Sequence, residues 1–164
     1  MPELLLICQA NICRSPLAEG VVKKLIQEGD FQEGWTTGSA GTWALEGRPA
    51  HPYTLALLKE AGIDLNGHRS REVTEKILAE ADLVLTMEAG QAEALRAEFP
   101  EQAGKVYMLS ELAGLRRDVE DPVGGTRGEF EQTAEVIEGY LRGSEAVMLE
   151  MMEGRRTGDG GREN

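Results

Sequence analysis

Short apolar runs alternate along the chain with segments whose apolar residues recur at helical spacing. Residues 4–7 form a continuous apolar run, which is typical of a strand buried on both faces. The same reasoning predicts further strands at residues 35–40, 81–87 and 105–109. Helices are predicted from Pro16 onward and at residues 53–61, 74–80, 90–99 and 129–142. Strands that alternate with helices predict an α/β fold, with a four-stranded parallel sheet and helices on both of its faces.

The length of the chain, 164 residues, suits one domain. We assign that domain to residues 1–153, which contain all of the predicted strands and helices. Residues 154–164 are polar and rich in glycine, so we expect them to be a disordered tail.

The charge balance narrows the possible partners. Lys and Arg total 17 and Asp and Glu total 29, so the formal net charge is −12. Such a surface repels nucleic acids and anionic membranes, and we expect neither as a partner. If the protein binds an anion, the positive potential must be built into one local site.

Cysteine and histidine usage indicates a soluble, cytoplasmic protein. The first apolar run is far too short to span a membrane and has no basic flank, so neither an anchor nor a signal peptide is expected. Two cysteines, Cys8 and Cys13, do not form a disulfide framework. The two histidines lie far from them in the sequence, so no metal site is expected.

The segment after the first predicted strand carries the clearest chemistry. Cys8 ends the strand, Arg14 stands six positions later, and a helix begins at Pro16. A loop this short can turn its backbone N–H groups toward one point as an anion-binding nest, and the helix start adds positive partial charge. The residues of this predicted phosphate-binding loop are Gln9, Ala10, Asn11, Ile12, Cys13, Arg14 and Ser15.

The side chains of this loop suit an oxyanion and a nucleophile. Arg14 can hold two phosphate oxygens in a planar fork, which a lysine cannot copy. The same positive field favours the thiolate form of Cys8, and Ser15 can donate a hydrogen bond to its sulfur. The alternative is a buried cysteine followed by a helix with an exposed arginine. Because the strand, the helix, Ser15 and Pro16 all agree with the oxyanion site, we favour that interpretation.

Residues 8–16 (CQANICRSP) resemble the phosphate loop of the low-molecular-weight protein tyrosine phosphatases, a family whose bacterial branch also includes protein arginine phosphatases. Other resembling segments follow in the family's order, at residues 38–42, 62–65, 68–71, 81–87 and 121–122. The resemblance implies a cysteine-dependent phosphatase that acts on phosphorylated proteins or peptides through a phosphocysteine. It also implies inhibition by phosphate and other oxyanions, a monomer, and no cofactor.

The resemblance assigns the catalytic roles. Cys8 is implied to attack phosphorus, while Arg14 and the loop amides hold the equatorial oxygens. Asp121 is implied to protonate the leaving oxygen and then to take a proton from the attacking water. Asp118 is the alternative acid.

The same resemblance names the residues that hold the phosphate-binding loop in place. It implies that the side chain of Asn11 ties the loop to Ser39 and His68. Asn11 is expected to adopt a left-handed backbone conformation, which asparagine tolerates. From the residues alone, Ser39 can equally be an ordinary strand residue and His68 a surface histidine. The family loop usually has glycine where this chain has Ala10, and a positive φ there would store about 1 kcal/mol of strain.

Cys13 has two interpretations. It can be a small buried apolar residue. It can also form a reversible disulfide with Cys8 that protects the nucleophile from over-oxidation.

The acid loop departs from the pattern of many phosphotyrosine enzymes, in which two tyrosines wall the substrate slot. Here residues 123–125 (VGG) provide no aromatic side chain. Trp43 can supply a wall instead, unless it belongs to the core. The predicted walls are Ile12, Trp43, Leu45 and Val123.

Substrate preference stays open between two phosphorylated residues. The Gly-Gly acid loop resembles that of protein arginine phosphatases, in which a threonine of the phosphate loop orients the nitrogen-linked substrate. Ile12 stands at that position, as in tyrosine-directed enzymes, and we favour phosphotyrosine. Arsenate reduction would need further cysteines after Cys13, and a non-catalytic phosphate-binding module would need neither Cys8 nor Asp121.

Overall fold

The computed structural model describes residues 2–162, and the side chains of residues 2–154. Its strands form one parallel sheet with the order β2-β1-β3-β4. The strands are β1 (Glu3–Cys8), β2 (Thr36–Gly41), β3 (Leu83–Thr86) and β4 (Val106–Met108). The helices are α1 (Arg14–Gln27), α2 (Pro52–Glu60), α3 (Glu75–Glu80), α4 (Ala89–Glu98), α5 (Arg127–Leu141) and α6 (Glu145–Arg162). Two 3₁₀ helices, η1 (Pro100–Lys105) and η2 (Leu109–Ala113), flank β4.

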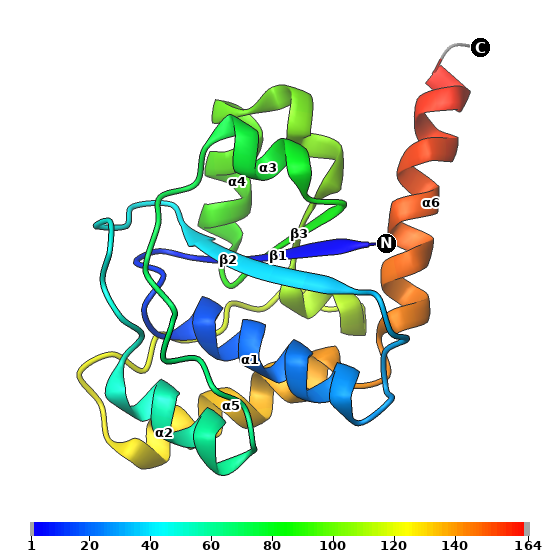
Figure 1. Ribbon diagram of the computed structural model, residues 1–164. Coiled ribbons are helices and arrows are strands. Elements are labelled where there is room, and N and C mark those ends of the chain that lie inside the picture. Colours follow the sequence, from blue (N-terminus) through cyan, green and yellow to red (C-terminus); the bar gives the residue numbers. More distant parts are fainter. Residues whose placement is uncertain (1, 163–164) are drawn as a thin grey trace.

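Helices cover both faces of the sheet, as predicted. Figure 1 shows α1, α2 and α5 below the sheet and α3 and α4 above it. Alternate residues of β1 point to opposite faces, so Leu4 and Leu6 join the core shared with α1 and α5, while Leu5 and Ile7 join the core shared with α3 and α4. Burial on both sides explains why residues 4–7 are continuously apolar.

The strand order places the functional site. The chain passes from β1 to β2 on one side of β1, and β3 lies on the other side. In an open α/β sheet, ligands bind beyond the carboxyl ends of the strands at such a switch point. The loops that follow β1 and β3 therefore meet there. Gly41, at the end of β2, lets the first of these loops approach, because a Cβ at that position would collide with the carbonyl oxygen of Gln9.

Helix α6 is absent from the predicted elements. Its start is fixed by Glu145, whose carboxylate accepts hydrogen bonds from the backbone N–H of Gln32 (2.7 Å) and from the indole N–H of Trp35 (2.8 Å). Met148, one turn further on, is buried in the core. The backbone is helical to Arg162, although we expected residues 154–164 to be disordered. Adding residues to a helix that is already packed avoids the cost of nucleation. Residues 163–164 lie outside the described part of the chain.

None of the helices within residues 2–162 has the length and apolar character needed to cross a membrane.

Candidate active site

The predicted phosphate-binding loop connects the end of β1 to the start of α1. Asn11, with φ 61°, is the only non-glycine residue with positive φ in the described chain. The left-handed backbone predicted for Asn11 is therefore present, and Ala10 carries no strain of this kind. The loop needs no glycine at position 10, because its left-handed residue is Asn11, and asparagine tolerates that conformation.

Two donors surround the sulfur of Cys8, which is 3% exposed. The hydroxyl oxygen of Ser15 lies 2.9 Å from it, and the backbone N–H of Asn11 donates to it at 3.3 Å. A thiolate can only accept, so in that form both groups donate to the sulfur. These contacts stabilise negative charge on Cys8.

The Asn11 side chain ties the loop to its surroundings. Its Nδ2 donates to the hydroxyls of Ser15 and Ser39, both at 2.9 Å, and its Oδ1 accepts from the backbone N–H of Arg71 at 3.0 Å. His68 Nε2 lies 2.8 Å from the backbone oxygen of Asn11. Ser39 and His68 thus both reach the loop, but His68 meets the backbone of Asn11 where we expected its side chain.

Two residues that help to hold the phosphate-binding loop, Glu19 and Arg71, were not predicted. Ser39 donates to the carboxylate of Glu19 at 2.7 Å, and Arg71 Nε donates to the Ser39 carbonyl at 2.9 Å. The sequence signal that could have found Glu19 is its place among the apolar residues of the predicted helix (LAEGVV, residues 17–22), because an acid on a buried face needs partners.

Arg14 is 2% exposed and is held by three groups. Its Nη1 donates to the Val119 carbonyl at 2.7 Å and pairs with Glu88 at 2.7 Å, while its Nη2 lies 3.7 Å from Asp121 Oδ2. Glu88 stands two residues after the end of β3, so the switch point of the sheet brings it beside the loop after β1. A carboxylate just after the strand predicted at residues 81–87 was the signal for this unpredicted partner.

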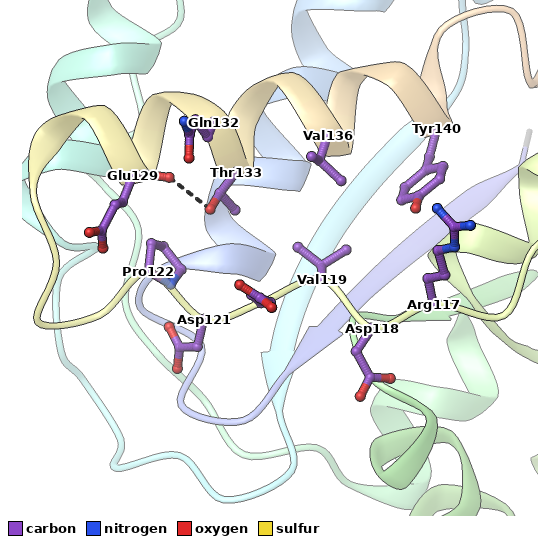
Figure 2. A pocket seen from close by; sticks show the side chains of 11 residues that line it. Arg117, Asp118, Val119, Asp121, Pro122, Glu129, Gln132, Thr133, Val136 and Tyr140 are labelled. Atoms are coloured by element: carbon purple, nitrogen blue, oxygen red, sulfur yellow. Dashed lines mark hydrogen bonds between the residues drawn. The ribbon is translucent and has the colours of Figure 1, made fainter.

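The two candidate acids have different surroundings. Asp121 points toward the phosphate loop (Figure 2), reaches Arg14, and accepts a hydrogen bond from the Val123 N–H at 3.1 Å. Asp118 instead accepts from the Ala89 N–H at 2.9 Å, at the start of α4. Asp121 is therefore the acid that the geometry favours. Since Arg14 also donates to the Val119 carbonyl, its guanidinium connects the phosphate-binding loop to the acid loop.

An apolar pocket of about 340 Å³ adjoins the loop. Ala10, Ile12, Trp43, Leu45 and Arg48 line it. Trp43 is 78% exposed, so the alternative that it belongs to the core is wrong.

The segment that carries Trp43 and Leu45 is tied down. Ser70 donates to the Leu45 carbonyl and accepts from the Arg48 N–H at 2.9 Å, which holds the exposed apolar side chains in place. Val123 is half-exposed and does not line the pocket, and Arg48 was not predicted.

Cys13 is buried and forms no disulfide with Cys8 in this structure. Burial raises the pKa of its thiol to about 12, and the nearby Asp121 carboxylate and Cys8 contribute in the same direction. A raised pKa keeps the thiol protonated at neutral pH. Cys13 thus behaves here as the small apolar residue, and a disulfide with Cys8 stays a prediction.

We expect the two cysteines to differ in alkylation. Iodoacetate, an anion that the loop can bind, should modify Cys8 at pH 8, whereas Cys13 should stay unmodified until the pH approaches 12. Peptide mass spectrometry of the folded protein measures both, and urea-unfolded protein is the control in which both react. Rapid labelling of folded Cys13 at pH 8 would contradict the raised pKa.

The arrangement suits phosphoryl transfer. A sulfur nucleophile lies beside a helix start and is contacted by a backbone amide, which together favour an anion. A guanidinium buried at the same place can hold charge on equatorial oxygens, and a carboxyl group near it can exchange a proton with a leaving oxygen.

Comparisons with known proteins agree with this chemistry. The family model described as low molecular weight phosphotyrosine protein phosphatase matches residues 3–150. A low molecular weight protein-tyrosine-phosphatase from Streptomyces coelicolor is 36% identical over 157 residues, which cover 91% of this chain and 94% of that protein. A protein-arginine-phosphatase from Bacillus subtilis is 34% identical over 143 residues, covering 85% of this chain and 92% of that protein.

A solved structure extends the likeness to three dimensions. It is the arginine phosphatase YwlE, as a cysteine-to-serine mutant whose active-site serine is phosphorylated. It superposes with a TM-score of 0.81 at 31% identity and covers 94% of this chain and 98% of that chain. The match to the family model over most of the chain, together with these relatives, shows that this chain belongs to the low molecular weight phosphotyrosine protein phosphatase family.

Proposed function

We propose that this protein is a protein tyrosine phosphatase that hydrolyses phosphomonoesters through a phosphocysteine on Cys8. The observation that carries the proposal is the meeting of three groups: the Cys8 sulfur with its donors, the buried Arg14, and Asp121 at 3.7 Å from that arginine. The phosphorylated active-site serine of the YwlE mutant, where a cysteine was replaced, supports a covalent intermediate at this position.

In the first step, the Cys8 thiolate attacks phosphorus and the bond from phosphorus to the leaving oxygen breaks. Asp121, protonated at this stage, gives its proton to that oxygen. Arg14 and the loop amides hold the three equatorial oxygens while charge redistributes over them.

In the second step, water attacks the phosphocysteine and Asp121 takes a proton from it. The bond from phosphorus to sulfur breaks, inorganic phosphate leaves and the thiolate returns. No metal is needed for either step, since the loop and Arg14 supply the positive charge.

The test is a side-by-side rate measurement on phosphotyrosine and phosphoarginine peptides, with inorganic phosphate as inhibitor. We expect turnover of phosphotyrosine and competitive inhibition by phosphate. Binding of phosphate with no turnover of either peptide would instead indicate a non-catalytic phosphate-binding module.

Phosphoarginine is the second candidate substrate, and residues 121–125 (DPVGG) together with the likeness to arginine phosphatases favour it. Ile12 lines the pocket beside the loop and favours phosphotyrosine. We expect Ile12→Thr to shift the ratio of phosphoarginine to phosphotyrosine turnover by about tenfold toward phosphoarginine, on the scale of one good polar contact. Ile77→Thr, the same change on α3 and outside the pocket, is the matched control. An unchanged ratio in Ile12→Thr would show that this position does not select the substrate.

Asp121→Asn should lower kcat on phosphotyrosine peptides by about 10²- to 10³-fold, which is the usual contribution of a general acid. The loss should be smaller on an aryl phosphate with an acidic phenol, because that leaving group departs without a proton. The matched control is Asp118→Asn, whose amide oxygen can still accept from Ala89. Equal losses in the two variants would contradict the assignment of the acid.

We infer a reducing compartment such as the cytoplasm, because the mechanism needs a free Cys8 and both cysteines are unpaired. The formal charge of −12 supports our inference that neither nucleic acid nor anionic membrane is a partner. We also infer a monomer.

A further inference from the structure

A groove of about 640 Å³ lies between the acid loop and α5, next to the catalytic acid. We call it the acid-loop groove; residues 117–122 form one wall, and the side of α5 that carries Glu129, Val136 and Tyr140 forms the other (Figure 2). Asp121 belongs both to this groove and to the contact with Arg14, so the groove is continuous with the active site.

The groove has the dimensions of an extended peptide. Along α5 from Glu129 to Tyr140 it runs for roughly 16 Å at about 1.5 Å per residue. That length accommodates about five residues of extended chain at about 3.3 Å each. Among the apolar residues of its lining, Val136 is 45% exposed, whereas Val119 and Pro122 are buried.

Two glutamate carboxylates near the catalytic end are uncompensated. Glu120 and Glu129 are exposed, and among the side chains of residues 2–154 neither carboxylate has an ion-pair or hydrogen-bond partner. Asp118 and Asp121 add two further carboxylates. The cation that lines the groove, Arg117, lies at the opposite end beside Tyr140 (Figure 2).

This charge pattern selects among the possible occupants. A nucleic acid would be repelled by the carboxylates, and a second copy of this chain would bring its own net charge of −12. A polypeptide with cationic side chains would be attracted and could place apolar parts of its chain on the lining.

We propose that the acid-loop groove binds the substrate segment that flanks the phosphorylated residue, and that it selects substrates with Lys or Arg within roughly three residues of that residue. This inference rests on the proposed function and adds a substrate class to it. Glu120 and Glu129 are specificity-determining residues, since they face the flanking segment and touch no reacting atom.

The test compares phosphotyrosine peptides that differ only in their flanks: lysines, alanines or glutamates, placed before or after the phosphotyrosine. We expect kcat/KM to be about tenfold higher for lysine than for glutamate flanks at low salt, on the scale of two surface ion pairs and the removed repulsion. The ratio should fall toward unity in 0.5 M NaCl, where the Debye length is only about 4 Å.

The double variant Glu120→Gln/Glu129→Gln should reduce this ratio to about twofold. The matched control, Glu93→Gln/Glu98→Gln, removes the same charge from two exposed positions of α4 and should keep the wild-type ratio. Equal reductions in both variants would show that overall charge, and not the groove, attracts the substrate.

Two outcomes separate this inference from the proposed function. If wild type hydrolyses a small aryl phosphate and shows the same kcat/KM for all the peptides, the groove selects nothing and the inference is wrong. If neither the aryl phosphate nor any peptide is hydrolysed, the proposed function itself fails.

Discussion

Cys8→Ser should lower kcat on an aryl phosphate by about 10⁴-fold or more, on the scale of losing a catalytic nucleophile. A serine hydroxyl can occupy the same place next to Ser15 and the Asn11 amide, so binding of phosphate should survive. The hydroxyl is far harder to ionise than a thiol, however, and among the side chains of residues 2–154 no base contacts position 8. The measurement is steady-state turnover together with the inhibition constant of phosphate.

The control for this variant is Cys13→Ser, which introduces the same change five positions away. Cys13 is buried and its thiol stays protonated, so it supplies no nucleophile and the variant should keep most of its activity once folded. If Cys8→Ser hydrolysed the aryl phosphate as fast as wild type, Cys8 would not be the nucleophile.

Arg14→Lys should lower kcat/KM by about 10³-fold even though the charge is kept. A lysine has no planar fork for two oxygens, and it cannot contact Val119, Glu88 and the substrate together. The acid loop would also lose its anchor at the Val119 carbonyl, so proton transfer from Asp121 should slow as well. Steady-state rates on a phosphotyrosine peptide and on an aryl phosphate with an acidic phenol separate the two effects, because the second substrate needs no proton.

Arg96→Lys is the matched control for this change. Arg96 Nη2 also donates to a backbone carbonyl, that of Val106 at 2.6 Å, but it lies on α4 away from the phosphate loop. We expect activity close to wild type. A comparable loss of activity in Arg96→Lys would mean that the effect at position 14 reflects folding and not phosphate binding.

The local parts of the site could be predicted because they depend on neighbours in the sequence. The strand, the short loop and the helix start that bring Cys8 and Arg14 together occupy one continuous segment. The left-handed Asn11 follows from the tolerance of asparagine for that conformation. The parallel sheet could be predicted because strands buried on both faces leave continuous apolar runs.

The long-range partners could not be predicted, since they depend on the order of the strands. Glu88 meets Arg14 because β3 lies beside β1, and Arg71 meets Asn11 although the two stand sixty positions apart in the sequence. The exposure of Trp43 depends on how Ser70 holds its segment. Helix α6 was missed because its glycine-rich end disfavours a helix locally, while Glu145 and Met148 fix its start through tertiary contacts.

The most direct measurement is a search for the covalent intermediate. Wild type and Asp121→Asn would be mixed with an aryl phosphate, quenched in acid within milliseconds, digested and analysed by mass spectrometry. We expect phosphate on the Cys8 peptide, with more of it in Asp121→Asn, where water attack lacks its base. Full turnover with no phosphate on Cys8, or with phosphate on another residue, would contradict the account.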